Sequence, residues 1–77
     1  MMVDNKIKEG ENVLLYSSKG KNWLVKAEHG AKVHTHLGYI ELSNIIGREY
    51  GETFETNLGA KMTILKPYLI DYVMKSA

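Results

Sequence analysis

Apolar and polar residues alternate in short runs over most of this chain, a pattern typical of β-strands with one buried face. Polar turns that contain glycine separate the runs, as expected for neighbouring strands joined by hairpins. The pattern therefore predicts a mainly β fold, a small antiparallel barrel-like or curled sheet of about five or six strands. The expected extended runs are residues 12–16, 23–25, 33–36, 39–42, 52–56 and 61–66.

Two stretches depart from this alternation and predict helical structure. In residues 43–47, Ser43 can cap a helical turn and Gly47 can end it in the left-handed conformation. Pro67 suits the first position of a short C-terminal helix, because a proline there loses no hydrogen bond. The apolar side of that helix would consist of Leu69, Ile70, Val73 and Met74. A helix of about nine residues is marginal in water, so this side needs a packing partner.

These patterns divide the chain into a flexible tail over residues 1–6, a barrel-like domain over 7–66 and a terminal helix over 67–77. The chain has no cysteine, which fits a reducing cytosol. It has no apolar run near the roughly 20 residues of a membrane helix, and residues 1–6 lack the apolar stretch of a signal peptide. We therefore expect a cytoplasmic protein that does not associate with membranes.

The charge balance limits the kind of nucleic-acid binding to expect. Ten basic and nine acidic residues give a formal charge of +1, whereas a chain devoted to binding phosphates is usually more basic. Lys19 and Lys21 flank Gly20 in an expected hairpin turn, where their ammonium groups can reach phosphates without base preference. Lys26, Lys32 and Arg48 could extend such a patch. The alternative is that the turn lysines are ordinary solvated residues.

The histidines and large aromatic residues allow several interpretations. His34 and His36 lie two residues apart, so on a strand they point the same way and could share an ion. A zinc site needs three or four protein ligands, so Glu28 or Glu41 would have to complete it. The favoured interpretation is that the histidines are exposed to solvent or form hydrogen bonds within a turn. The remaining alternative is that they contact RNA or another domain. Trp23 and Tyr39 could stack on a base, although rings in strands are more often core.

The sequence contains no pattern typical of a catalytic centre. No serine lies in a Gly-x-Ser-x-Gly elbow, and the carboxylates are scattered. The seven glycines are spread along the chain, which is typical of turns and unlike the clustered glycines that hold a dinucleotide or S-adenosylmethionine. We therefore predict no catalytic, cofactor-binding or metal-binding residue in this chain.

One combination of motifs resembles a known family. HTHLGYI at residues 34–40 is followed by IIGREYGE at 45–52, by Thr56 and Gly59, and by ILKP at 64–67. This order and spacing resemble the N-terminal domain of the tRNA (adenine-N1-)-methyltransferases, in their archaeal branch. These enzymes methylate a T-loop adenine of tRNA with S-adenosylmethionine. The resemblance extends from about residue 7 to the end of the chain.

The resemblance implies an accessory role. In the family this segment is the smaller domain beside a Rossmann-like catalytic domain, and it helps to hold tRNA or to organise a tetramer. Residues 67–77 would lead into the linker to the catalytic domain, which would bind S-adenosylmethionine. The residues expected to bind nucleic acid are Lys19, Lys21, His34, His36 and Arg48, and those expected to pack against another domain are Leu69, Ile70, Val73 and Met74. The alternatives are a purely structural packing module and an independent small-barrel RNA-binding protein.

Overall fold

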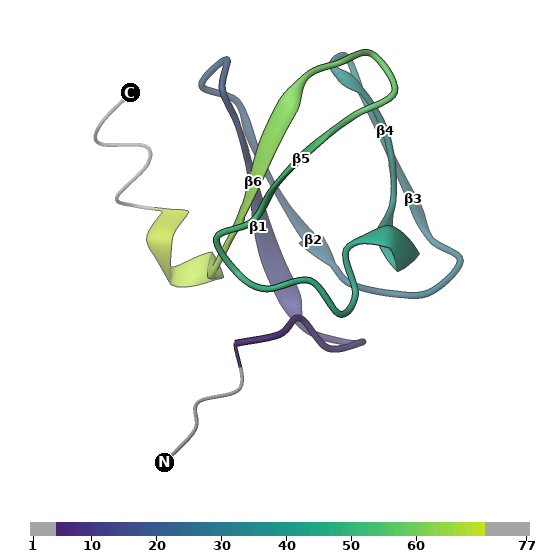
Figure 1. The fold of residues 1–77 in the computed structure, drawn as a ribbon, viewed down its shortest axis with the longest axis vertical. Coiled ribbons are helices and arrows are strands. Elements are labelled where there is room, and N and C mark those ends of the chain that lie inside the picture. The colour runs from purple at the N-terminus through teal and green to yellow at the C-terminus, as the bar shows by residue number, and fades with distance from the viewer. Residues whose placement is uncertain (1–4, 71–77) are drawn as a thin grey trace.

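Residues 5–70 are described by the computed structural model, and they contain six strands and two short 3-10 turns (Figure 1). The strands confirm the six runs that the alternating pattern predicts. In chain order the elements are β1 (Asn12–Ser17), β2 (Asn22–Lys26), β3 (Lys32–Thr35), β4 (Gly38–Glu41), η1 (Leu42–Asn44), β5 (Thr53–Glu55), β6 (Lys61–Leu65) and η2 (Pro67–Leu69).

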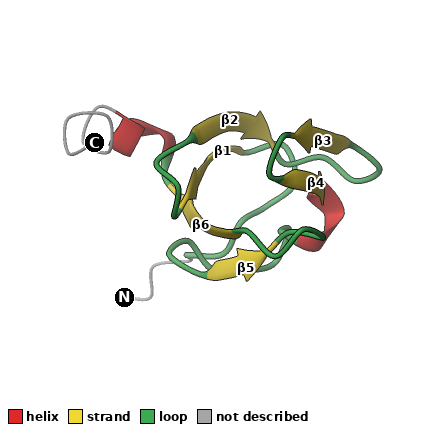
Figure 2. Cartoon of the chain, turned by 90° about the horizontal axis from the view of Figure 1, so that it is seen from above, coloured by secondary structure: helices red, strands yellow, loops and turns green. Residues whose placement is uncertain are grey.

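The strands form two antiparallel sheets. One has four strands in the order β2-β1-β6-β5, and the other is the β3–β4 hairpin. Seen from above, the strands follow one another round a ring, with the hairpin completing the circle begun by the larger sheet (Figure 2). The mainly β, antiparallel architecture is thus confirmed.

The ring does not close into a barrel within residues 5–70, because β2 forms no ladder with β3 and the edge strands β4 and β5 form none with each other. Side chains of the β5–β6 turn take the place of that ladder. The Tyr39 backbone N–H donates to Asn57 Oδ1 at 2.9 Å, and the Thr56 hydroxyl donates to the Leu37 carbonyl at 2.6 Å. We call the gap between β4 and β5 the seam.

The strand register separates an inner face from an outer face. Leu15 lies opposite Trp23 on β2 and Ile64 on β6, and all three point inward, whereas their neighbours in the chain point outward. The inner side chains bury the core. Its members are Ile7, Val13, Leu15, Ala27, Ile40, Leu42, Ile45, Met62 and Ile64.

The helical predictions need correction. The turn expected over 43–47 is the 3-10 turn η1, which begins after Glu41 and has no side-chain cap, so Ser43 does not cap it. Gly47 has φ +92°, as expected for a left-handed residue. The expected C-terminal helix is described only as η2, in which the Leu69 N–H bonds to the Lys66 carbonyl three residues back. Val73 and Met74 lie outside the described residues, and among residues 5–70 no helix is long and apolar enough to cross a membrane.

Asn5 and Lys6, at the end of the expected tail, are joined to the loop before β5. Asn5 Nδ2 donates to the Tyr50 carbonyl at 3.1 Å, and Lys6 forms an isolated antiparallel bridge with Glu49. Ile7 continues this pairing, since its N–H donates to the Arg48 carbonyl and its carbonyl accepts from Gly47. Asn5 and Lys6 are therefore paired with the loop before β5.

Candidate nucleic-acid interface

Lys19 and Lys21 lie at the tip of the β1–β2 hairpin, as the sequence predicts. The tip is held by Ser17, whose carbonyl accepts from the Gly20 N–H at 3.0 Å and whose hydroxyl accepts from the Lys21 N–H at 3.1 Å. Gly20 has φ +83°, a conformation that favours glycine. Both lysines are exposed, and neither ammonium group has a partner among the described residues. The tip therefore presents two free charges on a fixed backbone.

A third lysine joins them from β6. The Ser18 N–H donates to the Lys61 carbonyl at 3.0 Å, which places the start of β6 beside the hairpin tip. Lys61 is exposed, and its ammonium group has no partner within residues 5–70. We call Lys19, Lys21 and Lys61 the basic tip. The sequence pattern did not predict that Lys61 belongs to it, because the pairing of β1 with β6 joins strands that are far apart in the chain.

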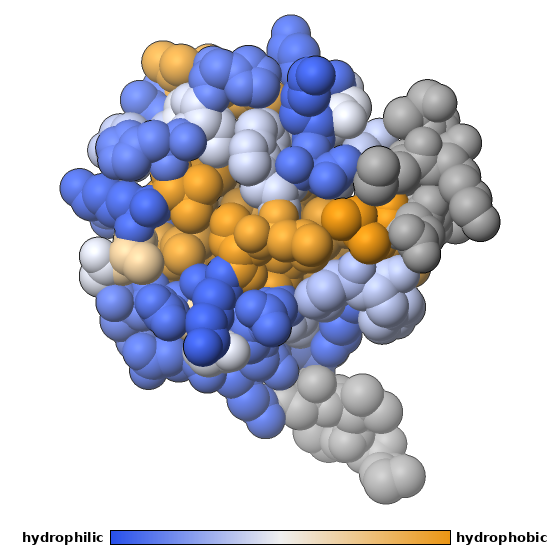
Figure 3. Space-filling view, turned by 180° about the vertical axis from the view of Figure 1, so that it is seen from behind, coloured by the Kyte–Doolittle hydropathy of each residue, from blue (hydrophilic) through white to orange (hydrophobic). Residues whose placement is uncertain are grey.

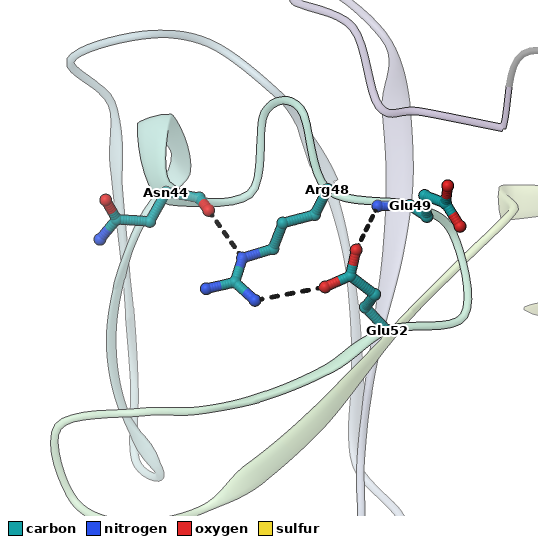
Figure 4. A network of polar contacts seen from close by, with 4 residues as sticks. All are labelled: Asn44, Arg48, Glu49 and Glu52. Carbon is teal, nitrogen blue, oxygen red and sulfur yellow. Dashed lines mark hydrogen bonds and ion pairs between the residues drawn. The ribbon is translucent and has the colours of Figure 1, made fainter.

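Arg48 lies in the loop between η1 and β5. In Figure 1 this loop lies at the opposite end of the long axis from the turn between β1 and β2. Its Nε donates to the Asn44 carbonyl at 2.9 Å, and its Nη1 lies 3.5 Å from Glu52 Oε1. The other carboxylate oxygen of Glu52 accepts from the Glu49 N–H at 2.7 Å (Figure 4). Arg48 therefore braces its own loop, and the structure does not bring it together with Lys19 and Lys21.

His34 and His36 are both exposed, but their rings lie against different aromatic side chains. The His34 ring centroid lies 6.1 Å from that of Tyr39, its cross-strand neighbour on β4. The His36 centroid lies 5.9 Å from that of Trp23 on β2. Among residues 5–70 there is no group of three or more histidine, aspartate or glutamate side chains placed to hold a metal ion. His34, Tyr39 and nearby Lys32 instead form an exposed aromatic and basic surface beside the seam.

A pocket of about 510 Å³ lies in the seam. Ile40, Ile45 and Phe54 are among the apolar residues that line it, while Tyr39 and Glu55 line it from the two facing strands. Sequence reasoning could not find this pocket, since it depends on the absence of a ladder between β4 and β5.

The outer face of the larger sheet carries a row of leucines. Leu14 on β1 is directly opposite Leu24 on β2 and Leu65 on β6, so the three side chains lie side by side. Leu14 is fully buried and η2 contacts β1, whereas Leu24 remains 54% exposed. An apolar band bordered by hydrophilic residues crosses the molecule in the view from behind (Figure 3). Leu69 and Ile70, two of the predicted packing residues, are half-buried at η2.

A polar cluster joins the start of β1 to the end of β6. The Tyr50 hydroxyl donates to Glu11 Oε1 at 3.2 Å, and Lys66 Nζ lies 3.8 Å from the centre of the Tyr50 ring. Loss of hydration raises the pKa of Tyr50 to about 12, and the Glu11 carboxylate adds to the effect. The hydrogen bond from the Lys8 N–H lowers the pKa of Glu11, with a smaller contribution from Tyr50. This cluster ties the loop before β5 to the residues that flank β1 and β6.

Comparison with known proteins decides the family. The family model described as TrmI-like N-terminal matches residues 6–54, more than half of the chain. This chain belongs to that family. The resemblance of its motifs to the N-terminal domain of tRNA (adenine-N1-)-methyltransferases is thereby confirmed.

A solved structure is similar over nearly the whole chain. It is the crystal structure of a SAM-dependent O-methyltransferase from Thermotoga maritima, with 39% sequence identity and a TM-score of 0.82. The match covers 96% of this chain and 28% of that protein. This TrmI-like domain thus spans little more than a quarter of the length of the methyltransferase it matches.

Proposed function

We propose that this chain is the accessory N-terminal domain of a SAM-dependent tRNA (adenine-N1-)-methyltransferase of archaeal type, and that it supplies phosphate contacts to tRNA. Membership of the TrmI-like family supports the assignment. The observation that carries the RNA contact is the basic tip, where Lys19, Lys21 and Lys61 gather without acidic partners among the described residues. Lysines on a fixed turn suit contacts to the phosphate backbone that carry no sequence preference.

The wider setting follows from the same proposal. The catalytic domain would bind S-adenosylmethionine, and the whole cytoplasmic enzyme would be a homo-oligomer, with a tetramer as the expected form. The present chain would not turn over substrate. Titration of the chain with S-adenosylmethionine is expected to give no saturable heat at micromolar ligand, and stoichiometric binding would contradict the accessory role.

Salt dependence of tRNA binding tests the phosphate contacts. Each phosphate contact releases counterions, so the double variant Lys19→Ala/Lys21→Ala should bind tRNA more weakly, with a slope of log K against log[salt] flatter by roughly two units. The matched control is Lys8→Ala/Lys26→Ala, which removes the same formal charge away from the tip: Lys26 lies at the other end of the β1–β2 hairpin, and Lys8 lies in the turn before β1. Equal slopes for the two double variants would show that Lys19 and Lys21 do not contact tRNA phosphates.

Arg48 is expected to contribute less than the tip. Its guanidinium already contacts the Asn44 carbonyl and Glu52, so a phosphate would have to compete with both. The variant Arg48→Ala should change the salt slope by less than about one unit while lowering the stability of the 44–52 loop. A slope change as large as that of either tip lysine would instead place Arg48 in the phosphate interface.

A packing role is the second candidate, and the leucine row favours it. Leu24 is 54% exposed on the edge strand β2, beside buried Leu14 on β1. An exposed leucine that continues a buried apolar row is a natural contact for a neighbouring domain or subunit. In a full-length methyltransferase that contains this domain, Leu24→Asn should weaken subunit association in light-scattering measurements, or lower the stability of the enzyme where Leu24 contacts another domain of the same chain. Unchanged mass at all concentrations, with unchanged stability, would argue against this role.

A further inference from the structure

The seam pocket combines an apolar floor with polar walls. On β4, Ile40 is buried in the core, whereas Tyr39 before it points outward, and Tyr39 is 41% exposed. Across the seam on β5, Phe54 packs against the core while Glu55 is exposed. Since alternate residues of a strand point to opposite faces, Ile40 and Phe54 form the floor, and Tyr39 and Glu55 stand on opposite walls. A flat ligand could thus lie against an aromatic wall above an apolar floor.

Three polar side chains at the rim of the pocket can form further hydrogen bonds. Asn57 Oδ1 accepts from the Tyr39 N–H, which leaves the amide Nδ2 of Asn57 available to donate. The Glu55 carboxylate and the Asn44 side-chain amide have no partner among the described residues. The pocket therefore offers amide donors at both ends and an acidic acceptor on one wall.

The charges argue against phosphate as the ligand of this pocket. Arg48 lines one end but is paired with Glu52, and Glu41 on the β4 wall is paired with Lys32 at 3.7 Å. Glu55 forms no ion pair with other described residues, although Lys61 is its cross-strand neighbour on β6, and its carboxylate can accept from N–H groups. Just outside the wall, Lys32 Nζ lies 5.6 Å from the centre of the Tyr39 ring, beside His34. A ligand that is neutral inside the pocket and anionic outside it fits this arrangement.

We propose that the seam pocket binds one unpaired base of RNA, stacked on Tyr39, with its phosphate outside the pocket near His34 and Lys32, where it would compete with Glu41 for the Lys32 ammonium group. The inference rests on the proposed RNA-binding function and deepens it by naming the part of RNA that is bound. The Glu55 carboxylate would accept from an exocyclic amine, so adenine, cytosine and guanine, which carry one, should be preferred to uracil. Stacking on an exposed aromatic ring supplies affinity without strict sequence readout.

Free nucleosides test the pocket independently of phosphate contacts. In ¹⁵N-labelled protein, millimolar adenosine or cytidine should give saturable shifts of the amides of Tyr39, Phe54, Glu55 and Asn57, whereas ribose 5-phosphate should not. The variant Tyr39→Ala should weaken adenosine binding about tenfold, as expected for the loss of one stacked base, and Tyr39→Phe should retain it. The matched control is Tyr68→Ala, because Tyr68 is 76% exposed on η2 and does not line the pocket.

A second variant separates the acceptor role of Glu55 from stacking. Glu55→Gln keeps the size of the side chain, and it should reduce the preference for adenosine and cytidine over uridine. Glu55 is exposed and its carboxylate forms no hydrogen bond or ion pair with other described residues, so the fold should be unaffected. An unchanged preference would remove Glu55 from base recognition and overturn the proposed orientation.

The outcomes distinguish this proposal from the proposed function. If millimolar nucleosides cause no shifts of the amide signals, the base site is overturned. The phosphate contacts of the basic tip are not affected by this result, because the salt dependence of tRNA binding tests them separately. Preferential binding of Nα-acetyl-arginine amide in the pocket would overturn it in favour of a protein side chain. Conversely, nucleoside binding that survives in Lys19→Ala/Lys21→Ala supports the pocket even if that variant leaves tRNA affinity unchanged.

Discussion

Gly38 shows how a single residue fixes the approach of the β3–β4 hairpin to the β5–β6 turn. It has φ +122°, and a Cβ atom at this position would lie 2.6 Å from Asn57 Oδ1 and 2.7 Å from Thr56 Oγ1. The backbone conformation and the close contact therefore both require glycine. The same contact places Asn57 where it accepts from the Tyr39 N–H at the end of the seam.

Gly38→Ala should be more destabilising than the same change in an open turn. Gly30 is a matched control, with φ +81° and no atom within 4 Å of the position that an added Cβ would take. Gly30→Ala should cost about 1–2 kcal/mol through backbone strain alone, and Gly38→Ala roughly 1–3 kcal/mol more because of overpacking. Urea unfolding of the two variants measures the difference. Equal costs would mean that the hairpin can move away from the turn.

Tyr50 links stability to pH through its raised pKa. Its pKa rises from 10.0 to about 12 on folding, so the folded state favours the protonated phenol. The stabilisation is complete below pH 10 and is lost as pH rises from 10 to about 12. Tyr50→Phe should be less stable than wild type below pH 10, because the bond to Glu11 is gone, and the difference should shrink above it. Free energies of unfolding measured at about pH 8, 10 and 11 would check this, and a constant difference would contradict it.

At the scale of elements, the strands were predictable and their partners were not. Alternation over residues 61–66 identifies Met62 and Ile64 as buried, and both are in the core. Nothing in that alternation indicates that β6 pairs with β1 on one side and β5 on the other. The C-terminal helix is predicted from the spacing of four apolar residues, two of which, Val73 and Met74, lie outside the described residues. Its described part makes an i to i+3 turn.

Thr56 joins the β3–β4 hairpin to the larger sheet through hydrogen bonds, so its substitution tests how much this link contributes to stability. Its buried hydroxyl donates to the Leu37 carbonyl at 2.6 Å and accepts from the Leu58 and Ala60 N–H groups at 3.3 and 3.2 Å. Thr56→Val keeps the shape but leaves these groups without a partner, so it should cost about 1–3 kcal/mol. Thr53→Val is the control, because its hydroxyl pairs with Thr63 on the exposed face and should matter much less. Similar costs for both, measured by urea unfolding, would show that Thr56 does not hold the seam together.

At the scale of the whole molecule, only part of the candidate interface could be read from the sequence. Lys19 and Lys21 were predictable because they flank a turn glycine, a local feature. Lys61 and the seam pocket were not, since both arise where residues distant in sequence meet. Charge alone predicts that Arg48 joins the lysines, whereas its contacts with Asn44 and Glu52 depend on the conformation of the loop, which charge does not reveal.

The two sheets share one core, so the molecule should unfold as a unit. Ile40 of the hairpin, Ile45 after η1 and Ile64 of the larger sheet belong to the same buried cluster. Unfolding of either sheet would therefore expose the apolar face of the other to water. Trp23, the only tryptophan, lies on β2 against His36 of the hairpin turn, so its fluorescence reports the junction of the sheets, while circular dichroism reports all strands. Thermal melts followed by the two signals should coincide. An earlier fluorescence transition would mean that the hairpin separates first, and the seam pocket would then be lost before the fold.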